Sequence, residues 1–415
     1  MQTPNTALKT YKQGVLAFSL FFALFYGAIG IILPFLNIHF RQIGFSGVQI
    51  SSLLVLGLII QISMVSQLGF WFDNSPRKRI ILTFAVLALA LTMAFLPIAR
   101  HYLPILILYV MNYTIGMITG SVAVNLSYQA GTHPSGGTNR FGSMRLWGSV
   151  GFSVMALLGG ILMEKKGILL NDFIYILLQL SLAAVIFWVI PQQSFAHEGA
   201  ADSPDSPSGF KQVIKMVFNN RYLWMTVLAL AMTDTLNDGI RAFEPVFMKE
   251  LGISTAVIGL VSTLGALVEI PVLFWGGRIL EKLGTNKLVI AVIAFDLIRR
   301  FFVWLLPMPG VVMAASILNA VSFPVRLLVT IYLVNTFIPK RFTTTANGFI
   351  SVALYGLGYI FSNAVCGLIY DYFGPRQNYL FWSALAFLAL LLAVTAGKPP
   401  QKQGLEHSLH PAAEL

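Results

Sequence analysis

Charged residues are scarce in this chain of 415 residues. Asp, Glu, Lys and Arg together make up 10% of the sequence, whereas hydrophobic residues make up 57% and the mean hydropathy is +0.77. A soluble protein of this size carries about 25% charged residues. Because charge is scarce along the whole length, the composition excludes a soluble globular protein and indicates a polytopic membrane protein.

Other absences exclude further classes of protein. The single cysteine, Cys366, excludes disulfides and cysteine-ligated metal sites within one chain. No HExxH, Walker A, GxSxG or dinucleotide-binding motif occurs in the structural context that each requires, so we expect no enzyme, no bound cofactor and no metal. The first apolar run follows "MQTPNTALKTYKQ" without a small-residue cleavage site, and we interpret it as a retained helix.

Twelve apolar runs are long enough to span a membrane as helices. They cover residues 14–37, 47–71, 79–99, 102–127, 143–163, 172–190, 221–247, 254–277, 287–306, 309–336, 343–369 and 378–396. The stretch "PQQSFAHEGAADSPDSPSGFK" (191–211) is rich in Pro, Ser, Asp and Gly, which is typical of a flexible linker. We therefore predict a six-helix bundle over 1–190, a flexible cytoplasmic linker over 191–218, a second bundle over 219–397 and a cytoplasmic tail over 398–415.

The distribution of Lys and Arg predicts the orientation of the spans. With the N-terminus in the cytoplasm, the cytoplasmic segments contain 16 of the 27 basic residues and the opposite side contains six. We therefore expect both termini in the cytoplasm. The same bias accounts for most of the net charge of +11, so the charge does not require a nucleic-acid partner.

One short pattern occurs four times, at the ends of spans 2, 5, 8 and 11. It reads Gly, three residues, Asp or Glu, two residues, Gly or Pro. The copies are Gly69/Asp73/Pro76, Gly160/Glu164/Gly167, Gly277/Glu281/Gly284 and Gly367/Asp371/Gly374. The copies lie 91, 117 and 90 residues apart, and the longest step contains the linker. The repeating unit is therefore three spans, and the odd number inverts alternate units, which predicts an all-α transporter with two six-helix bundles and a site at the bundle interface.

Two segments of the sequence resemble the major facilitator superfamily, and the resemblance extends over the whole chain. "GFWFDNSPRKR" (69–79) is similar to the gating loop of that family between spans 2 and 3, with Gly69, Asp73, Arg77 and Lys78 in place. "RLWGSVGF" (145–152) resembles the start of span 5 in 3-phenylpropionate permeases and nucleoside–proton symporters, and more loosely in lactose permease. "GALVEIPVLF" (265–274) and Arg300 match the same group.

The resemblance implies a proton-coupled solute transporter of the bacterial inner membrane. The sequence departs from the lactose-permease group at two points. Span 4 reads "NLSYQAGTHPSGG" without the carboxylate of that group, and Asn319 replaces its span-10 histidine. These departures disfavour a sugar substrate and proton coupling through histidine.

Several charged residues lie inside the predicted spans, where each costs roughly 2.5–3.5 kcal/mol on insertion scales unless it has a partner or faces a cavity. We predict that three carboxylates take part in proton coupling: Glu269, Asp234 and Asp238. We predict that seven residues bind substrate: Arg145, Tyr26, Asn125, Tyr128, Asn319, Arg326 and Arg300.

Structural roles remain open for several of these residues. Asp234 and Asp238 share a helix face with Arg241, and either could pair with Arg241 or with Arg326. The pairing of Asp296 with the arginines of span 9 could either lock helix packing or contact the substrate. Arg299 could simply face a neighbouring helix. Tyr26 could serve ordinary close packing.

Two positions have a predicted depth. Glu269 lies eight residues before Gly277, about 12 Å from the cytoplasmic end of its helix, so it can exchange protons at mid-bilayer. Arg145 is the one charge that we place inside the spans of the first half. It lies fifteen residues before Gly160, which puts it roughly 8 Å inside a core of about 30 Å. We expect Arg145 to line the central cavity, and the alternative is an arginine that snorkels and reinforces topology.

The sequence therefore predicts a proton-coupled importer of a small polar or anionic organic solute, which works by alternating access. An exporter of metabolites or drugs on the same fold is the first alternative, and a non-transporting sensor is the second. We expect a monomer whose partners are a small-molecule substrate, protons and the lipid bilayer.

Overall fold

The structure is a computed structural model that describes residues 4–96, 98–131, 140–195, 207–339, 342–350 and 355–397. Its α-helices are α1 (Pro4–Gln42), α2 (Gly47–Asn74), α3 (Lys78–Phe95), α4 (Tyr102–Ala130), α5 (Phe141–Lys166), α6 (Ile168–Ala184), α7 (Pro207–Asn219), α8 (Arg221–Glu250), α9 (Thr255–Leu283), α10 (Thr285–Leu305), α11 (Pro309–Phe337), α12 (Thr343–Phe349), α13 (Leu357–Phe373) and α14 (Pro375–Thr395). A π-helical turn, Val185–Val189, continues α6.

The twelve predicted spans correspond to α1–α6, α8–α11, α12 together with α13, and α14. Nine of the helices in the described ranges are long and apolar enough to cross a membrane. The other long helices include α8 and α10, which carry the buried charges that the sequence places in spans 7 and 9. A helix satisfies its own backbone hydrogen bonds, so these apolar runs can lie in lipid. The all-α membrane fold is confirmed.

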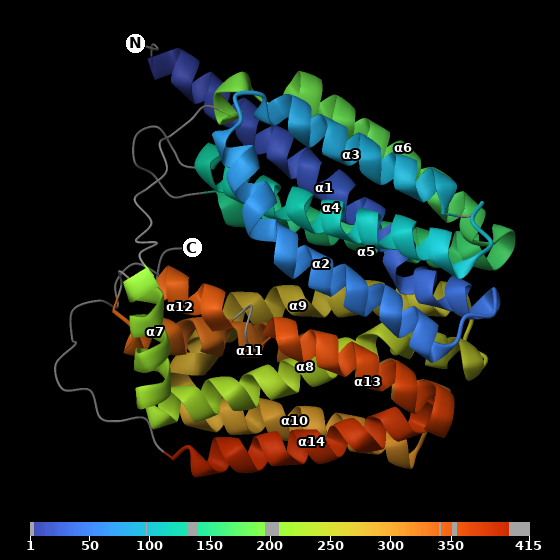
Figure 1. Cartoon of the computed structure of the whole chain (residues 1–415), viewed down its shortest axis with the longest axis vertical. Coiled ribbons are helices and arrows are strands. Elements are labelled where there is room, and N and C mark those ends of the chain that lie inside the picture. The colour runs from blue at the N-terminus through green and yellow to red at the C-terminus, as the bar shows by residue number, and fades with distance from the viewer. Residues whose placement is uncertain are drawn as a thin grey trace.

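The helices form two bundles (Figure 1). One contains α1–α6, with α1 packed against α5 and α6 and α3 packed against α4 and α6. The other contains α8–α14, with α14 packed against α8 and α10 and α11 packed against α8, α9 and α10. The two bundles contact each other mainly through α2 with α13 and through α5 with α9.

The last residue of the repeated pattern has a defined backbone role. Gly167, Gly284 and Gly374 have φ angles of 73°, 73° and 85°, and each is the one residue between two consecutive helices. This left-handed conformation favours glycine because a Cβ atom would be strained there. The first copy has Pro76 at this place, and α2 and α3 are correspondingly joined by a longer turn.

The predicted flexible linker over 191–218 is wrong in its last 12 residues, because α7 occupies residues 207–219. Val213 and Val217 lie one helical turn apart and are fully buried, while Lys215 between them is exposed. This apolar face packs α7 against α8 and α12, across the ends of the second bundle (Figure 1). Residues 196–206 of the linker and the predicted tail over 398–415 lie outside the described residues.

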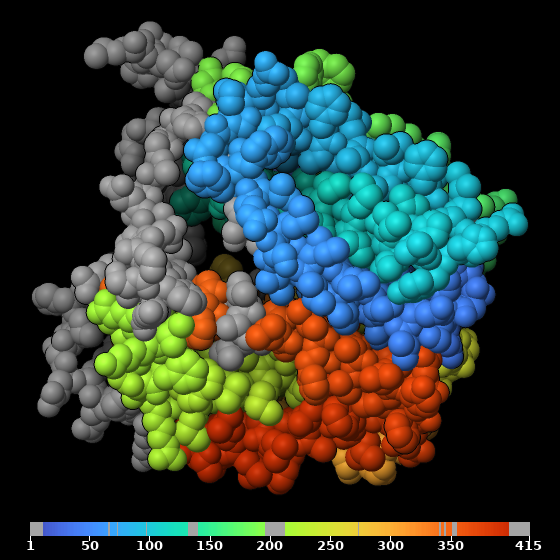
Figure 2. All heavy atoms as spheres, in the orientation of Figure 1, coloured from blue at the N-terminus to red at the C-terminus, as the bar shows by residue number. Residues whose placement is uncertain are grey.

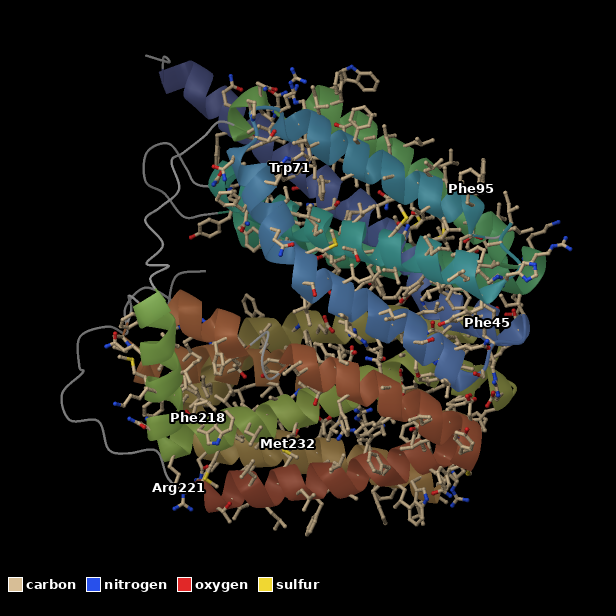
Figure 3. All side chains as sticks on the ribbon, in the orientation of Figure 1. Phe45, Trp71, Phe95, Phe218, Arg221 and Met232 are labelled. Atoms are coloured by element: carbon tan, nitrogen blue, oxygen red, sulfur yellow. The ribbon has the colours of Figure 1, made fainter. Side chains whose placement is uncertain are left out.

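The two ends of the molecule differ. We call the end where α1 begins and α14 ends the open end, because Figure 2 shows the molecule hollowed there between the bundles. We call the opposite end the closed end, since the bundles meet there. Phe45, just before α2, marks the closed end, and Trp71, in the last turn of α2, marks the open end (Figure 3).

Candidate functional site: the bundle interface

Two carboxylates join the bundles at the closed end. Asp371, in the last turn of α13, accepts hydrogen bonds from the backbone N–H groups of Gly47 (2.6 Å) and Val48 (2.8 Å) at the start of α2. Glu164, near the end of α5, accepts a hydrogen bond from the backbone N–H of Ala256 (3.0 Å) at the start of α9. Each carboxylate therefore caps a helix of the opposite bundle, where unpaired N–H groups and the helix dipole favour a negative charge.

The glycines of the same repeats permit this contact. A Cβ atom on Gly160 would lie 2.4 Å from the carbonyl oxygen of Thr255, and one on Gly367 would lie 2.5 Å from the carbonyl oxygen of Gly47. In contrast, a Cβ atom on Gly69 or Gly277 would meet no described atom within 4 Å. Two of the four repeat glycines are therefore in backbone contact across the interface, and the two at the open end are not.

Further bonds between the bundles lie on the same side of the molecule. The Asn37 side chain donates to the carbonyl oxygen of Ala242 (2.7 Å), and Thr263 donates to the carbonyl oxygen of Ser153 (2.8 Å). The Arg41 guanidinium lies 3.5 Å from Glu250 and 3.9 Å from Asp371. The closed end is thus sealed by polar contacts that reach into the middle of α5 and α9.

A buried ionic network fills the second bundle. Arg326 on α11 is 1% exposed and forms an ion pair with Asp234 on α8 at 3.0 Å and a second, shorter one with Asp296 on α10. Tyr359 donates a further hydrogen bond to Asp234. Arg299 lies 3.5 Å from Asp296. Asp234 therefore has the structural pairing with Arg326 that the sequence left open.

Arg300 and Arg326, which the sequence predicts to bind substrate, lie inside the second bundle in this structure. Arg300 is fully buried and donates to the carbonyl oxygen of Thr233 at 3.2 Å. Asn319 is half-buried and accepts a hydrogen bond from Arg299 at 3.0 Å. These side chains face the interior of their own bundle because the carboxylates of Asp234 and Asp296 neutralise the arginines there.

Another charged pair lies on the side of the second bundle that faces α4. Arg241 and Asp238 on α8 are 3.5 Å apart, with side chains 66% and 25% exposed. Asn363 on α13 donates to Asp238 at 2.8 Å. Tyr113 on α4 interacts electrostatically with both members of the pair, so the pair lies opposite the first bundle. The sequence placed Arg241 on this helix face but not among the substrate-binding residues.

Arg145 lies against the first bundle's own aromatic residues. Its guanidinium carbon is 3.9 Å from the ring centroid of Tyr26 and 5.9 Å from that of Phe22. A Cβ atom on Gly148 would come within 2.8 Å of both the Arg145 guanidinium and the Tyr26 ring, so glycine allows the two to stack. The structure thus joins two predicted substrate-binding residues, Arg145 and Tyr26, in one cation–π contact.

Glu269 lies near the charged side chains of both bundles, Arg241 on one side and Arg145 on the other. It lies half-buried on α9 and interacts electrostatically with Arg241 of its own bundle and with Arg145 of the other. Within the described part of the chain, Glu269 has no ion-pair partner closer than 4 Å. Away from the closed-end contacts, the described part of the interface thus presents four charged side chains: Arg145, Asp238, Arg241 and Glu269.

The remaining predicted residues lie nearer the open end. Asn125 and Tyr128, late in α4, are both exposed, and the Tyr128 ring lies 6.1 Å from that of Phe141. Gly69 lies near the end of α2, Arg77 is exposed in the turn that follows, and Lys78 starts α3. The side chain of Asp73 lies outside the described residues.

The first bundle contains a buried carboxylate that the sequence reading missed. Asp172, one turn inside α6, is 4% exposed, and its Oδ1 has no hydrogen-bond partner among the described residues. Arg145 is therefore not the one charge inside this bundle. Asp172 falls at the first residue of the apolar run over 172–190, so hydropathy marks it as an edge residue, whereas α6 begins four residues earlier.

Comparison with known proteins supports the fold. A family model described as MFS_1 like family matches residues 15–381. The uncharacterized transporter YwbF of Bacillus subtilis (strain 168) is 21% identical over 413 residues, which cover 99% of this chain and 98% of that protein. The maltose permease of Geobacillus stearothermophilus is 22% identical over 401 residues, which cover 95% and 99% of the two chains.

Solved structures share the architecture at low sequence identity. The nucleoside transporter NupG aligns with a TM-score of 0.79 at 14% identity and covers 92% of this chain and 98% of its own. A bacterial homologue of the iron transporter ferroportin, in an inward-facing state, aligns with a TM-score of 0.73 at 14% identity, over 95% and 99% of the chains. At these identities the likeness establishes the fold.

Proposed function

Because this chain belongs to the MFS_1 like family, and is thus a multi-pass membrane transporter rather than an enzyme, we propose that it carries out proton-coupled symport of a small polar or anionic organic solute. Transport proceeds by alternating access, in which the two bundles close at one end of the molecule while they open at the other. The membrane is the bacterial inner membrane.

The asymmetry of the repeat glycines carries this proposal. Gly160 and Gly367 touch the opposite bundle at the closed end, while Gly69 and Gly277 have open space at the other end. The four glycines occupy equivalent positions of an inverted repeat, so the reverse packing is available to the same chain. Exchange between the two packings exposes the interface first to one side of the membrane and then to the other.

The orientation follows from charge. Loops at the open end carry the excess of Lys and Arg, which favours the cytoplasmic side. The closed end then faces outward, and the described conformation opens to the cytoplasm. In this orientation both ends of the chain lie inside the cell.

Glu269 is the proton-coupling residue in this proposal. Asp234 is paired with Arg326, and Asp238 is bonded to Arg241 and Asn363. Glu269 instead lies between the bundles without a close ion-pair partner among the described residues. A carboxyl in this position can take up a proton when the interface faces one side and release it when the interface faces the other.

Uptake into proteoliposomes tests the proposal. Radiolabelled uridine, maltose and benzoate are offered with an inward proton gradient, an outward one or none. We expect at least one probe to accumulate only with the inward gradient. Glu269→Gln is expected to abolish accumulation but retain exchange of the same probe, while Arg221→Gln, which removes an exposed charge at the open end, retains both. Accumulation only with the outward gradient would indicate an exporter, and no flux of any probe would contradict the transport proposal.

A further inference from the structure

The charges inside the second bundle balance one another. Three buried carboxylates and three buried arginines lie within its core: Asp234, Glu244, Asp296, Arg299, Arg300 and Arg326. The ion pairs of Arg326 and Arg299 with Asp234 and Asp296 connect most of this group. With all six groups ionised the charges sum to zero, so this core does not need the charge of a ligand.

The charges at the interface between the bundles also balance one another. Among the described residues, two arginines and two carboxylates face the central part of the interface, away from the closed-end contacts: Arg145, Arg241, Asp238 and Glu269. Asp238 lies beside Arg241, so Glu269 supplies the charge that balances Arg145. The sum is zero while Glu269 is ionised, and it becomes plus one when Glu269 takes up a proton.

Both arginines have donors available for a second anion. An arginine carries five N–H donors, and the one described ion pair of Arg241 spans 3.5 Å with the side chain 66% exposed. The guanidinium carbon of Arg145 lies 3.9 Å from the centroid of the Tyr26 ring, and this cation–π contact does not use the N–H groups as hydrogen-bond donors. Within the described residues, Arg145 has no carboxylate closer than 4 Å. A planar guanidinium matches the two oxygens of a carboxylate.

We propose that the substrate is a monocarboxylate whose carboxylate replaces Glu269 as the counter-charge of Arg145 and Arg241, so that Arg241 is a second substrate-binding residue. The proposal rests on the proposed function and specifies its substrate class. The substrate anion binds as Glu269 takes up a proton, and the two leave together when Glu269 ionises again. One proton and one anion therefore cross together, and transport is electroneutral. A neutral solute would leave the protonated interface with an unpaired positive charge.

Ligand-induced thermal stabilisation of the purified full chain tests this proposal. The probes are acetate, pyruvate and benzoate, each compared with its neutral amide, together with uridine and maltose. We expect at least one carboxylate, and none of the neutral probes, to raise the unfolding temperature. Its apparent affinity should rise by about tenfold for each unit of decrease in pH over the range where Glu269 is ionised, because one proton is taken up for each anion bound.

Variants separate a specific site from general charge attraction. Glu269→Gln should bind the same carboxylate with no pH dependence, because the side chain is permanently neutral. Arg241→Gln should lose at least tenfold in affinity, while the matched control Arg221→Gln, which alters an exposed arginine at the open end, should not change binding.

Several outcomes would overturn the proposal: stabilisation by uridine, maltose or an amide, no stabilisation by any carboxylate, or unchanged pH dependence in Glu269→Gln. If proteoliposomes concentrate a neutral probe under a proton gradient, the transport proposal stands and the monocarboxylate proposal fails. If a carboxylate binds as described but its flux does not depend on the proton gradient, the proposal of proton-coupled transport fails instead.

Discussion

Asp371 and Gly47 join the two halves of the molecule although 324 positions separate them in the sequence, because the Asp371 carboxylate accepts a 2.6 Å hydrogen bond from the Gly47 backbone N–H. Glu164, two repeats before Asp371, makes the equivalent bond to Ala256. The acidic position of the repeat therefore acts as a helix cap that works across the interface. Such a cap is released as a unit when the bundles separate.

Asp371→Asn should loosen the closed end. A carboxylate at a helix N-terminus contributes about 0.3–1 kcal/mol, so its loss should speed hydrogen exchange at the Gly47 and Val48 amides by roughly two- to fivefold. The Ala256 amide should exchange faster as well, because the two caps open together when the bundles move. Exchange mass spectrometry or NMR measures all three amides. A change confined to Gly47 and Val48 would show that the cap is local and that the bundles do not move as units.

Gly160→Ala should impair transport, whereas the same substitution at Gly265 should not. The added methyl group at Gly160 would lie 2.4 Å from the Thr255 carbonyl oxygen, while at Gly265 it would meet no described atom within 4 Å. Both sites lie in membrane-spanning helices, so helix propensity affects them alike. Proteoliposome uptake should fall at least tenfold in Gly160→Ala. Equal uptake by both variants would contradict a closed state that depends on backbone contact.

Arg145→Lys should reduce transport at least tenfold and leave the amount of protein in the membrane unchanged. Lysine keeps the charge but loses the planar guanidinium that stacks on Tyr26 and binds a carboxylate through two N–H groups. Arg221→Lys is the matched control at an exposed position. A fully active Arg145→Lys variant would favour the alternative in which Arg145 reinforces topology from the headgroup region.

Arg326→Met should destabilise the protein rather than alter its substrate affinity. Removing one partner from a buried ion pair costs about 3–5 kcal/mol, because Asp234 would lose its described ion-pair partner and Asp296 would keep only Arg299. Thermal unfolding in detergent should show a clear decrease in the unfolding temperature, with Arg221→Met as the exposed control. An unchanged unfolding temperature combined with lost substrate binding would show instead that Arg326 binds substrate.

The twelve spans were predictable because their apolar runs are long and most are separated by charged or glycine-containing turns. The repeat also identified residues whose importance is structural, since Gly160 and Asp371 were singled out by spacing alone. Helix α7 was missed because the polar composition before it extends into its first turn, although Val213 and Val217 already show a helical spacing.

The pairing of the buried charges was not predictable in the same way. Asp234 and Arg326 lie 92 residues apart, and their contact depends on how α8 and α11 are rotated against each other. Sequence spacing places residues on a helix face but does not say which neighbour that face meets. For this reason the sequence reading placed Arg300, which lies in the bundle core, among the substrate-binding residues. It left out Arg241, which faces the interface.

Reciprocal movement of the two ends is the central claim, and paired spin-label distances measure it directly. One pair replaces Trp71 and Phe218 at the open end, and the other replaces Ile43 and Tyr372 at the closed end; all four side chains are exposed (Figure 3 labels the first pair). The native Cys366 is buried and is not expected to take up label. In Gly160→Ala, which disfavours closure, we expect the open-end distance to shorten and the closed-end distance to lengthen relative to the wild type. Distances that stay fixed, or that change in the same direction at both ends, would contradict alternating access.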